Sequence, residues 1–329
     1  MAAILEVRDL AIEFKTDRGT VRAVDGVDFE LKASQALGIV GESGCGKSVT
    51  AMAIMGLLPY MNGRMVRGSV VFDGKDLSTL SERDYRKIRG QALSMIFQDP
   101  MTSLNPVYSV GKQMMQVLDQ HRPSLSRKTQ ISRCLELIDR VGLKDPEKSF
   151  HAYPHELSGG MRQRVMIAMA LLCEPKILIA DEPTTALDVT TQAQILKLIR
   201  DLQKDSAMAL ILVTHDMGVI AESVEQLMVM YCGKVVEKGS VKYVLKNPMH
   251  PYSRGLLDSI PVVRSSKLDR LPVIPGIVPD LMSLPQGCRF ADRCMRVRDE
   301  CRSHLPPIKA LKDQHVVSCL FPLSKGELL

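Results

Sequence analysis

The pattern of apolar and polar positions along the chain has two periods, and the shorter one comes first. Apolar side chains recur about every second residue in 4–14 and again in 21–31, with Gly19 between them, which predicts two strands joined by a turn. Short apolar runs that end at turn or polar residues predict further strands at 36–40, 69–72, 93–97, 177–180, 209–213, 227–231 and 234–238.

Helical stretches lie between these predicted strands. Residues 49–58 are apolar and free of proline, and residues 81–89 are mostly charged. In 110–141, apolar positions such as Ile131 and Leu135 follow a period near that of a helix. Strands that alternate with helices predict an α/β fold.

The charge of the chain is uneven. The net charge of the 329 residues is +6, and residues 240–329 hold 14 Lys and Arg against 8 Asp and Glu, so we expect a separate small unit at this end. A basic tail can bind nucleic acid or a membrane surface. Seven Phe, seven Tyr and no Trp do not favour a platform for stacking bases, and we expect no nucleic-acid partner.

Apolar runs such as 207–213 are too short to cross a bilayer. No basic segment precedes an apolar segment at the N-terminus, as it does in an export signal. We therefore expect a chain that is not exported and that reaches any membrane through a partner.

Residues 41–48 fit the phosphate-loop pattern at every fixed position, between a predicted strand and a predicted helix. Backbone N–H groups and the helix N-terminus would face phosphate oxygens. Lys47 would reach the β- and γ-phosphates, and the Ser48 hydroxyl would bind Mg²⁺. A glycine-rich turn with a chance lysine is the alternative. The candidate nucleotide-binding residues here are Gly41, Glu42, Ser43, Gly44, Cys45, Gly46, Lys47, Ser48 and Val49.

Two further segments place polar groups at the ends of predicted elements. Ser158-Gly159-Gly160 stands directly before a predicted helix, which is a second anion-binding geometry, although alone it more often marks a plain N-cap. Asp181 and Glu182 end a predicted strand. In a phosphate-loop enzyme the first carboxylate holds Mg²⁺ and the second can polarise the attacking water, whereas the alternative is a solvated strand end.

Two single residues are weaker candidates. His215 follows the strand predicted at 209–213, at the edge where ligands bind in parallel sheets, although a lone histidine is usually structural. Phe14, at a strand end, would stack on an adenine ring or belong to the core, and the two alternatives are about equal.

Taken together, these motifs resemble those of the ATP-binding subunits of ABC transporters, over about residues 4–240. The Leu-Ser-Gly-Gly motif at 157–160 separates that family from other phosphate-loop ATPases. The resemblance implies an ATPase domain at 1–260 with an inserted helical subdomain at about 99–160, whose loop at 99–106 lies near membrane subunits. In the order of the family, the motifs are Phe14, 41–48, Gln98, 157–160, Asp181-Glu182, 186–188 and His215.

The resemblance also implies ATP and Mg²⁺ as cofactors and a role for each candidate. Two such domains pair head to tail, so that the phosphate loop of one and Ser158, Gly159 and Gly160 of the other enclose each ATP. Phe14 stacks on adenine, and Asp188 lies at the dimer seam. The implied Mg²⁺ ligands are Ser48, Gln98 and Asp181. The implied catalytic residues are Glu182 as general base, His215 at the γ-phosphate, and Gln98, which senses Mg²⁺ and the attacking water.

The segment at 250–257 resembles a His-Pro-Tyr element of the oligopeptide/dipeptide importer ATPases, and 271–272 and 274–276 fit the proline-rich segment that follows it. Within that family the chain most resembles the dipeptide branch. The resemblance implies ATP-driven peptide uptake at the cytoplasmic face of the bacterial inner membrane. The implied partners are two transmembrane permease subunits, a second homologous ATPase in a heterodimer and, indirectly, a peptide-binding protein.

Two other functions stay open. The nickel and antimicrobial-peptide branches are close relatives within the same importer family. A soluble ABC ATPase of DNA repair or translation is the more distant alternative. The single set of ATPase motifs and the absence of sustained heptads speak against it.

Four cysteines gather in the last predicted domain, 261–329, at 288, 294, 301 and 319. Four thiols in so short a segment suit a metal site, the usual zinc spacing is not met, and disulfides are disfavoured without an export signal. The resemblance implies a [4Fe–4S] centre held by Cys288, Cys294, Cys301 and Cys319, with Zn²⁺ as the alternative, although Met295 stands where relatives usually have proline. We expect five arginines to neutralise it, namely Arg289, Arg293, Arg296, Arg298 and Arg302.

Overall fold

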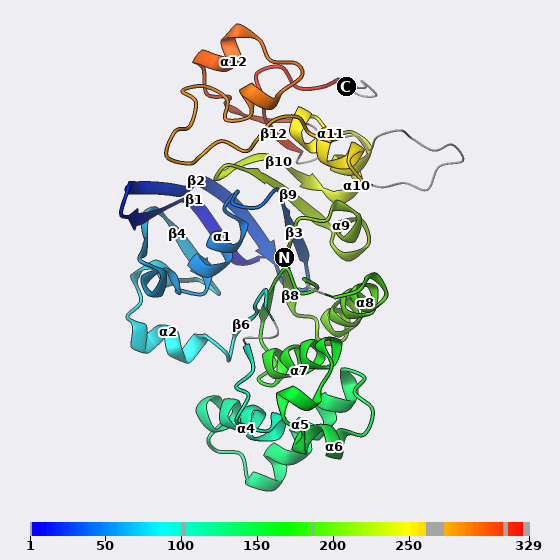
Figure 1. Cartoon of the computed structure of the whole chain (residues 1–329). Coiled ribbons are helices and arrows are strands. Elements are labelled where there is room, and N and C mark those ends of the chain that lie inside the picture. Colours follow the sequence, from blue (N-terminus) through cyan, green and yellow to red (C-terminus); the bar gives the residue numbers. More distant parts are fainter. Residues whose placement is uncertain (1, 100–102, 186, 261–272, 312–314, 325–329) are drawn as a thin grey trace, which may run out of the picture. The chain divides into compact units, whose positions relative to one another are not determined.

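The computed structural model describes residues 2–99, 103–185, 187–260, 273–311 and 315–324 (Figure 1). The chain forms two compact units. The helical unit contains residues 79–212 with the short pieces 1–2 and 32–35, and the phosphate-loop unit contains 3–31, 36–78 and 213–329.

The phosphate-loop unit contains an antiparallel sheet with the strand order β2-β1-β4-β5. Strand β1 pairs with β4 in an antiparallel register that shifts between Arg8 and Ile12, where three successive residues of β1, 10–12, are buried. Predicted strands at 4–14, 21–31 and 69–72 lie within these elements. The strands are β1 (Ala3–Thr16), β2 (Gly19–Lys32), β4 (Gly63–Phe72) and β5 (Lys75–Asp76).

The same unit contains five further strands in the order β11-β12-β10-β9-β3. Strand β3 (Ala36–Val40) is buried at every position and runs parallel to β9 (Gln226–Tyr231). The helix predicted at 49–58 begins and ends earlier, as α1 (Lys47–Ile54), because Gly56 takes a φ of +65° that stops it. The other strands and α-helices are β10 (Lys234–Ser240), β11 (Ile308–Ala310), β12 (Val316–Ser318), α9 (Met217–Ser223), α10 (Val241–Lys246), α11 (Pro251–Asp258) and α12 (Asp299–Ser303).

The helical unit contains the buried strands β7 and β6 and residues 209–212 of β8, in the order β8-β7-β6, with several helices (Figure 1). The helical stretch predicted at 110–141 is two helices, because Pro123 follows the end of the first and Ser126 caps the second. The elements are α2 (Glu82–Ile88), β6 (Leu93–Ile96), α4 (Val110–His121), α5 (Arg127–Arg140), α6 (Pro146–His151), α7 (Gly159–Leu171), β7 (Ile177–Asp181), α8 (Val189–Ser206) and β8 (Ala209–Thr214).

The predicted α/β fold is confirmed, with buried parallel pairs β3–β9 and β6–β7. The domain boundary predicted after residue 260 falls inside the phosphate-loop unit and stays a prediction. Residues 100–102, 186 and 271–272 of the predicted motifs lie outside the described residues. Within the described part of the chain, no helix combines the length and apolar character that a membrane crossing requires.

Candidate nucleotide-binding and catalytic residues

Glycines give the phosphate loop its shape between β3 and α1. Gly41, Gly44 and Gly46 take φ values of +154°, +78° and +101°, a region that residues with a Cβ rarely adopt. Space is also short, because a Cβ on Gly41 would lie 2.2 Å from the carbonyl oxygen of Met230. The fixed glycines of the pattern are therefore required by the backbone of this unit.

Lys47 lies inside this loop, with a relative exposure of 4%. Its Nζ donates to the carbonyl oxygens of Gly41 at 2.8 Å and Glu42 at 3.0 Å. The backbone thus satisfies the ammonium group that the sequence assigns to the β- and γ-phosphates. The Thr50 hydroxyl donates to the Gly46 carbonyl at 2.9 Å and ties the loop to α1. Ser48 and Val49, in the first turn of α1, are half-buried.

Phe14 lies near the end of β1, opposite Gly63 of β4. The ring covers that glycine closely, because a Cβ on Gly63 would lie 2.7 Å from the ring atom Cε1. Phe14 is half-buried, so it packs on the sheet on one side. Its stacking on adenine stays a prediction.

The helical unit brings Gln98 and Glu182 together. Strand β7 ends at Asp181, which is 2% exposed, and Glu182 follows with a φ of +46°. The Gln98 side-chain amide donates to the Glu182 carboxylate at 3.1 Å, and the Thr185 hydroxyl donates to the same oxygen at 3.1 Å. A left-handed conformation is unfavourable for glutamate, so the surrounding contacts hold it in place.

The Ser158-Gly159-Gly160 turn begins α7 in the same unit. Ser158 is the N-cap, and its side chain accepts the N–H of Met161 at 3.3 Å. The turn lies beside α8, because a Cβ on Gly160 would lie 2.9 Å from the Thr191 methyl carbon Cγ2. The exposed Ser158 hydroxyl and the two half-buried glycines form the first turn of a long helix.

Asp188 caps the neighbouring helix α8. One oxygen of its carboxylate accepts the Thr191 N–H at 3.0 Å, and the other accepts the Thr191 hydroxyl at 2.6 Å. The bond from the Thr191 hydroxyl lowers the pKa of Asp188 below its usual range, with help from the backbone N–H. Asp188 and the Ser158-Gly159-Gly160 turn therefore share Thr191 as a neighbour.

The predicted site residues are divided between the two units. Phe14, the phosphate loop and His215 belong to the phosphate-loop unit. His215 is exposed directly after β8, and the next residue, Asp216, caps α9. Gln98, Ser158, Gly159, Gly160, Asp181, Glu182 and Asp188 belong to the helical unit.

Sequence reasoning missed two residues that contact the phosphate loop. The Tyr252 hydroxyl accepts the backbone N–H of Glu42 at 2.8 Å, and Arg293 forms a two-fold ion pair with the Glu42 carboxylate. Tyr252 belongs to the His-Pro-Tyr element, which indicated the family but predicted no contact with the phosphate loop. No periodicity or spacing links these positions to Glu42.

The expectation that five arginines neutralise a metal centre is wrong for three of them. Arg289 pairs with Asp25 at 2.6 Å and also donates to the Cys232 carbonyl oxygen. Arg293 pairs with Glu42, and Arg302 pairs with Asp292 at 2.7 Å. A carboxylate within hydrogen-bond distance satisfies a guanidinium directly. Of the other two, Arg298 lies over the Phe321 ring and Arg296 lines the cysteine cavity described below.

The four C-terminal cysteines line one small cavity in the phosphate-loop unit, together with His250 and Phe290. Burial raises the pKa of the Cys288 and Cys319 thiols to about 11, and it also raises the pKa of Cys294. Among the described residues, no group of three or more His, Cys, Asp or Glu side chains is placed to hold a metal ion. The structure therefore does not support the predicted metal centre beyond this convergence of thiols.

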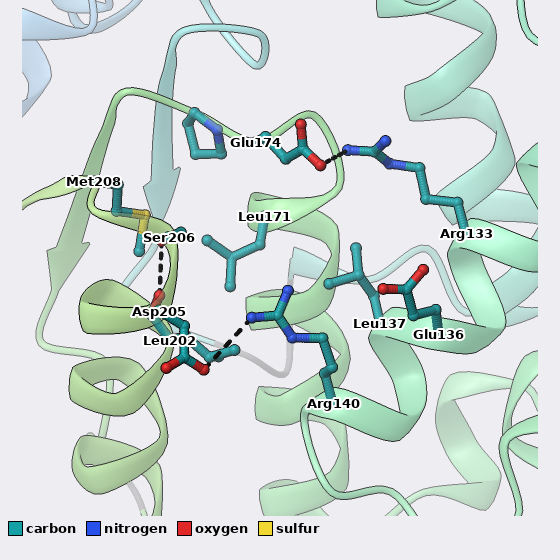
Figure 2. A pocket seen from close by; sticks show the side chains of 11 residues that line it. Arg133, Glu136, Leu137, Arg140, Leu171, Glu174, Leu202, Asp205, Ser206 and Met208 are labelled. Atoms are coloured by element: carbon teal, nitrogen blue, oxygen red, sulfur yellow. Dashed lines mark hydrogen bonds and ion pairs between the residues drawn. The ribbon is translucent and has the colours of Figure 1, made fainter.

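A cavity of about 320 Å³ in the helical unit is lined by none of the predicted site residues (Figure 2). Helices α5, α7 and α8 supply most of its lining. Arg133 pairs with Glu174 at 2.9 Å, and Arg140 lies 3.7 Å from Asp205 at its edge. Leu137, Leu171 and Leu202 add apolar surface. The two arginines and their acidic partners neutralise one another, and we assign the cavity no function.

Comparisons with known proteins agree with this geometry. A family model described as ABC transporter matches residues 24–185, and one described as the C-terminal region of oligopeptide/dipeptide transporters matches 236–301. A similar solved structure is the dimeric structure of a post-hydrolysis state of the ATP-binding cassette MJ0796 bound to ADP and Pi, whose sequence is 27% identical to this chain. It has a TM-score of 0.65 and covers 72% of this chain and 98% of its own.

Two curated proteins of Bacillus subtilis are similar over nearly the whole chain. The oligopeptide transport ATP-binding protein OppD is 51% identical, over 95% of this chain and 87% of its own length. The dipeptide transport ATP-binding protein DppD is 48% identical, over 99% and 97%. The chain belongs to the ABC transporter family and is an ATP-binding, ATP-hydrolysing subunit. Within that family it belongs to the oligopeptide/dipeptide type.

Proposed function

We propose that this subunit hydrolyses ATP to drive the import of dipeptides and longer peptides. One observation supports ATP hydrolysis: the Glu182 carboxylate, directly after β7, accepts hydrogen bonds from Gln98 and Thr185. A general base has to be fixed in this way to accept a proton from the attacking water. The names of the relatives support peptides as the solute, because both OppD and DppD are peptide transport proteins. Their similar identities do not separate short from long peptides. The preference for dipeptides stays a prediction.

The proposed roles follow from the chemistry of each side chain. Lys47 would exchange the loop carbonyls for the β- and γ-phosphates, and Phe14 would stack on adenine. Mg²⁺, held by the oxygens of Ser48, Gln98 and Asp181, would neutralise charge on the phosphates. Glu182 would accept the proton of the attacking water, and His215 would donate a hydrogen bond to the γ-phosphate.

The Ser158-Gly159-Gly160 turn is complete as a helix N-terminus, and in our proposal it faces the ATP held by a second ATPase subunit. Support comes from the similar cassette solved as a dimer. The second subunit would be homologous rather than identical. Two transmembrane permeases and an external peptide-binding protein would complete the importer, with this subunit at the cytoplasmic face of the bacterial inner membrane.

We also propose that the four-cysteine cavity holds a [4Fe–4S] centre. The four thiols line one cavity although they come from different parts of the tail, which supports a shared ligand. When bound, the centre would crosslink the tail.

Iron and sulfide analysis of anaerobically purified full-length protein tests this centre. Four irons and four sulfides per chain are expected, and Cys319→Ser should lower both. Cys173→Ser is the matched control, because Cys173 is buried in the helical unit and outside the cavity. One zinc and no iron would overturn the proposal.

Uptake of labelled peptides tests the function. Cells with the native importer are compared with cells that express Lys47→Ala at an equal level, using dipeptides and longer peptides. Loss of uptake is expected, because the lysine that would neutralise phosphate charge is gone. Unchanged uptake of all peptides, in cells without a redundant system, would contradict the proposal, and nickel uptake would be measured next.

A further inference from the structure

Glu42 occupies a position at which the phosphate-loop pattern allows any residue. Its side chain nevertheless forms an ion pair with Arg293, which belongs to the C-terminal tail (residues 240–329). Arg293 Nη1 donates to Glu42 Oε2 at 2.6 Å, and Nη2 donates to Oε1 at 2.9 Å. The Arg293 side chain is 5% exposed, so little water competes for it. A bidentate pair of this kind fixes the plane of both groups and is stronger than a surface ion pair.

Arg293 is itself held firmly. Its Nε donates to the Pro275 carbonyl oxygen at 2.9 Å, and its Nη1 lies 3.3 Å from the Tyr231 hydroxyl. Gly276, with a φ of +76°, leaves room for it, because a Cβ there would lie 3.1 Å from Arg293 Cγ. The guanidinium therefore reaches Glu42 from a rigid base within the tail.

A second contact reaches Glu42 through its backbone. The Glu42 N–H donates to the Tyr252 hydroxyl at 2.8 Å. Tyr252 is fully buried, with its ring 4.7 Å from that of Tyr231 and 5.3 Å from that of Phe290. This aromatic cluster fixes the Tyr252 hydroxyl, so one peptide of the loop is tied to the segment that follows the ATPase motifs.

We propose that Arg293 and Tyr252 are positioning residues for ATP, and that the tail thereby sets the affinity of the phosphate loop. Lys47 draws the carbonyls of Gly41 and Glu42 toward its ammonium from inside the loop. Arg293 and Tyr252 hold Glu42 from outside. Because Arg293 and Tyr252 hold Glu42 independently of Lys47, the remaining N–H groups of the loop stay in place for phosphate oxygens when Lys47 exchanges the loop carbonyls for the phosphates.

Four variants test the role of the ion pair: Arg293→Gln, Arg293→Lys, Glu42→Gln and the double variant Glu42→Gln/Arg293→Gln. The dissociation constant for MgATP is measured on the full-length chain, and KM and kcat are measured on the assembled importer. Arg293→Gln should weaken ATP binding about tenfold, equivalent to about 1.4 kcal/mol, with kcat at saturating ATP nearly unchanged. Arg293→Lys keeps the charge without the bidentate geometry and should rescue part of the affinity.

The double variant should bind ATP no more weakly than Arg293→Gln, because both changes remove one interaction. Arg302→Gln is the matched control, since it removes an exposed arginine of the same segment that pairs with Asp292. Wild-type ATP affinity in a folded Arg293→Gln variant would overturn the proposal. An equal loss in Arg302→Gln, or fully additive losses in the double variant, would overturn it as well.

Tyr252→Phe decides the matter if Arg293→Gln does not fold. It removes one oxygen and keeps the ring in the aromatic cluster. A weaker affinity for MgATP with an unchanged melting temperature supports the proposal, and wild-type affinity contradicts it. The assignment of the chain to the ATPase family stands apart from either result, because it rests on the family match.

Discussion

The phosphate loop and the Ser158-Gly159-Gly160 turn both place glycines at the start of a helix, but their glycines serve different surroundings. Gly41 and Gly46 take left-handed φ values and would collide with carbonyl oxygens of their own unit if they carried a Cβ. A Cβ on Gly159 would meet only Leu187 Cδ2, at an ordinary 3.7 Å. Gly41 and Gly46 are therefore required by the fold of their own unit. Gly159 is not, and its lack of a side chain leaves space in front of the helix N-terminus.

Gly41→Ala should have the largest effect. The new Cβ would lie 2.2 Å from the Met230 carbonyl oxygen, and the backbone cannot yield without opening the loop. We expect a loss of about 3 kcal/mol in the free energy of unfolding and no measurable ATP binding. Denaturant unfolding measures the first, and titration with MgATP measures the second. Wild-type stability would mean that the loop is not held by its own unit.

Gly159→Ala should leave stability unchanged or slightly raised, because alanine favours a helix and the space is free. In the assembled importer we expect ATPase activity to fall about tenfold or more, since in our proposal the turn faces the nucleotide of the second subunit. Thermal unfolding of the chain and ATPase assays of the importer separate the two effects. Normal importer activity would contradict the proposed role of the turn.

Acid should weaken the support of the phosphate loop and not that of the turn. His250 caps α11 by accepting the Tyr252 N–H at 3.0 Å, and complete burial lowers its pKa to about 4. An unfolded histidine titrates near 6.5, so the unfolded chain takes up the proton first as the pH falls. Stability should be full above pH 6.5 and should fall by about 2 kcal/mol by pH 5.

His250→Asn provides the comparison for this acid effect. Asparagine keeps an oxygen that can cap the helix and does not titrate. Thermal unfolding from pH 7 to pH 5 should therefore show a flatter profile in the variant. Equal slopes in the two proteins would show that other groups control the acid response.

A smaller loss of stability than at Gly41 is expected at Gly160, where a new methyl group meets a side chain rather than the backbone. A Cβ there would lie 2.9 Å from Thr191 Cγ2. Gly160→Ala should cost about 1 kcal/mol. Adding Thr191→Ser removes that methyl group and keeps the hydroxyl that bonds to Asp188, so stability should return. No recovery in the double variant would place the strain elsewhere.

Local features of the sequence predicted the phosphate loop and most strands, because each depends on neighbours in the chain. The buried strand β3 and the glycines after it are recognisable as a pattern. Helix ends were less predictable, since the break at Pro123 lies inside an apolar period that continues on both sides. The role of Gln98 was expected only through a family resemblance, and its hydrogen bond to Glu182 was not predicted.

Long-range contacts between charged residues could not be predicted from the sequence. Arg293 and Glu42 are 251 positions apart, and five arginines near the cysteines looked alike before the structure separated them. Which carboxylate each arginine meets depends on how the tail packs on the strands. That packing depends on contacts between buried rings and on hydrogen bonds to the backbone, and no regular spacing in the sequence indicates which residues make them.

The ion pairs of Arg289 with Asp25 and of Arg293 with Glu42 limit which tails can be exchanged between related genes by recombination. The two ion pairs join the last part of the chain to two segments near its beginning. A recombination event that exchanged the tails of two relatives would transfer one member of each pair and leave the other behind. Functional hybrids should therefore arise mainly between relatives that already share the residues at positions 25 and 42.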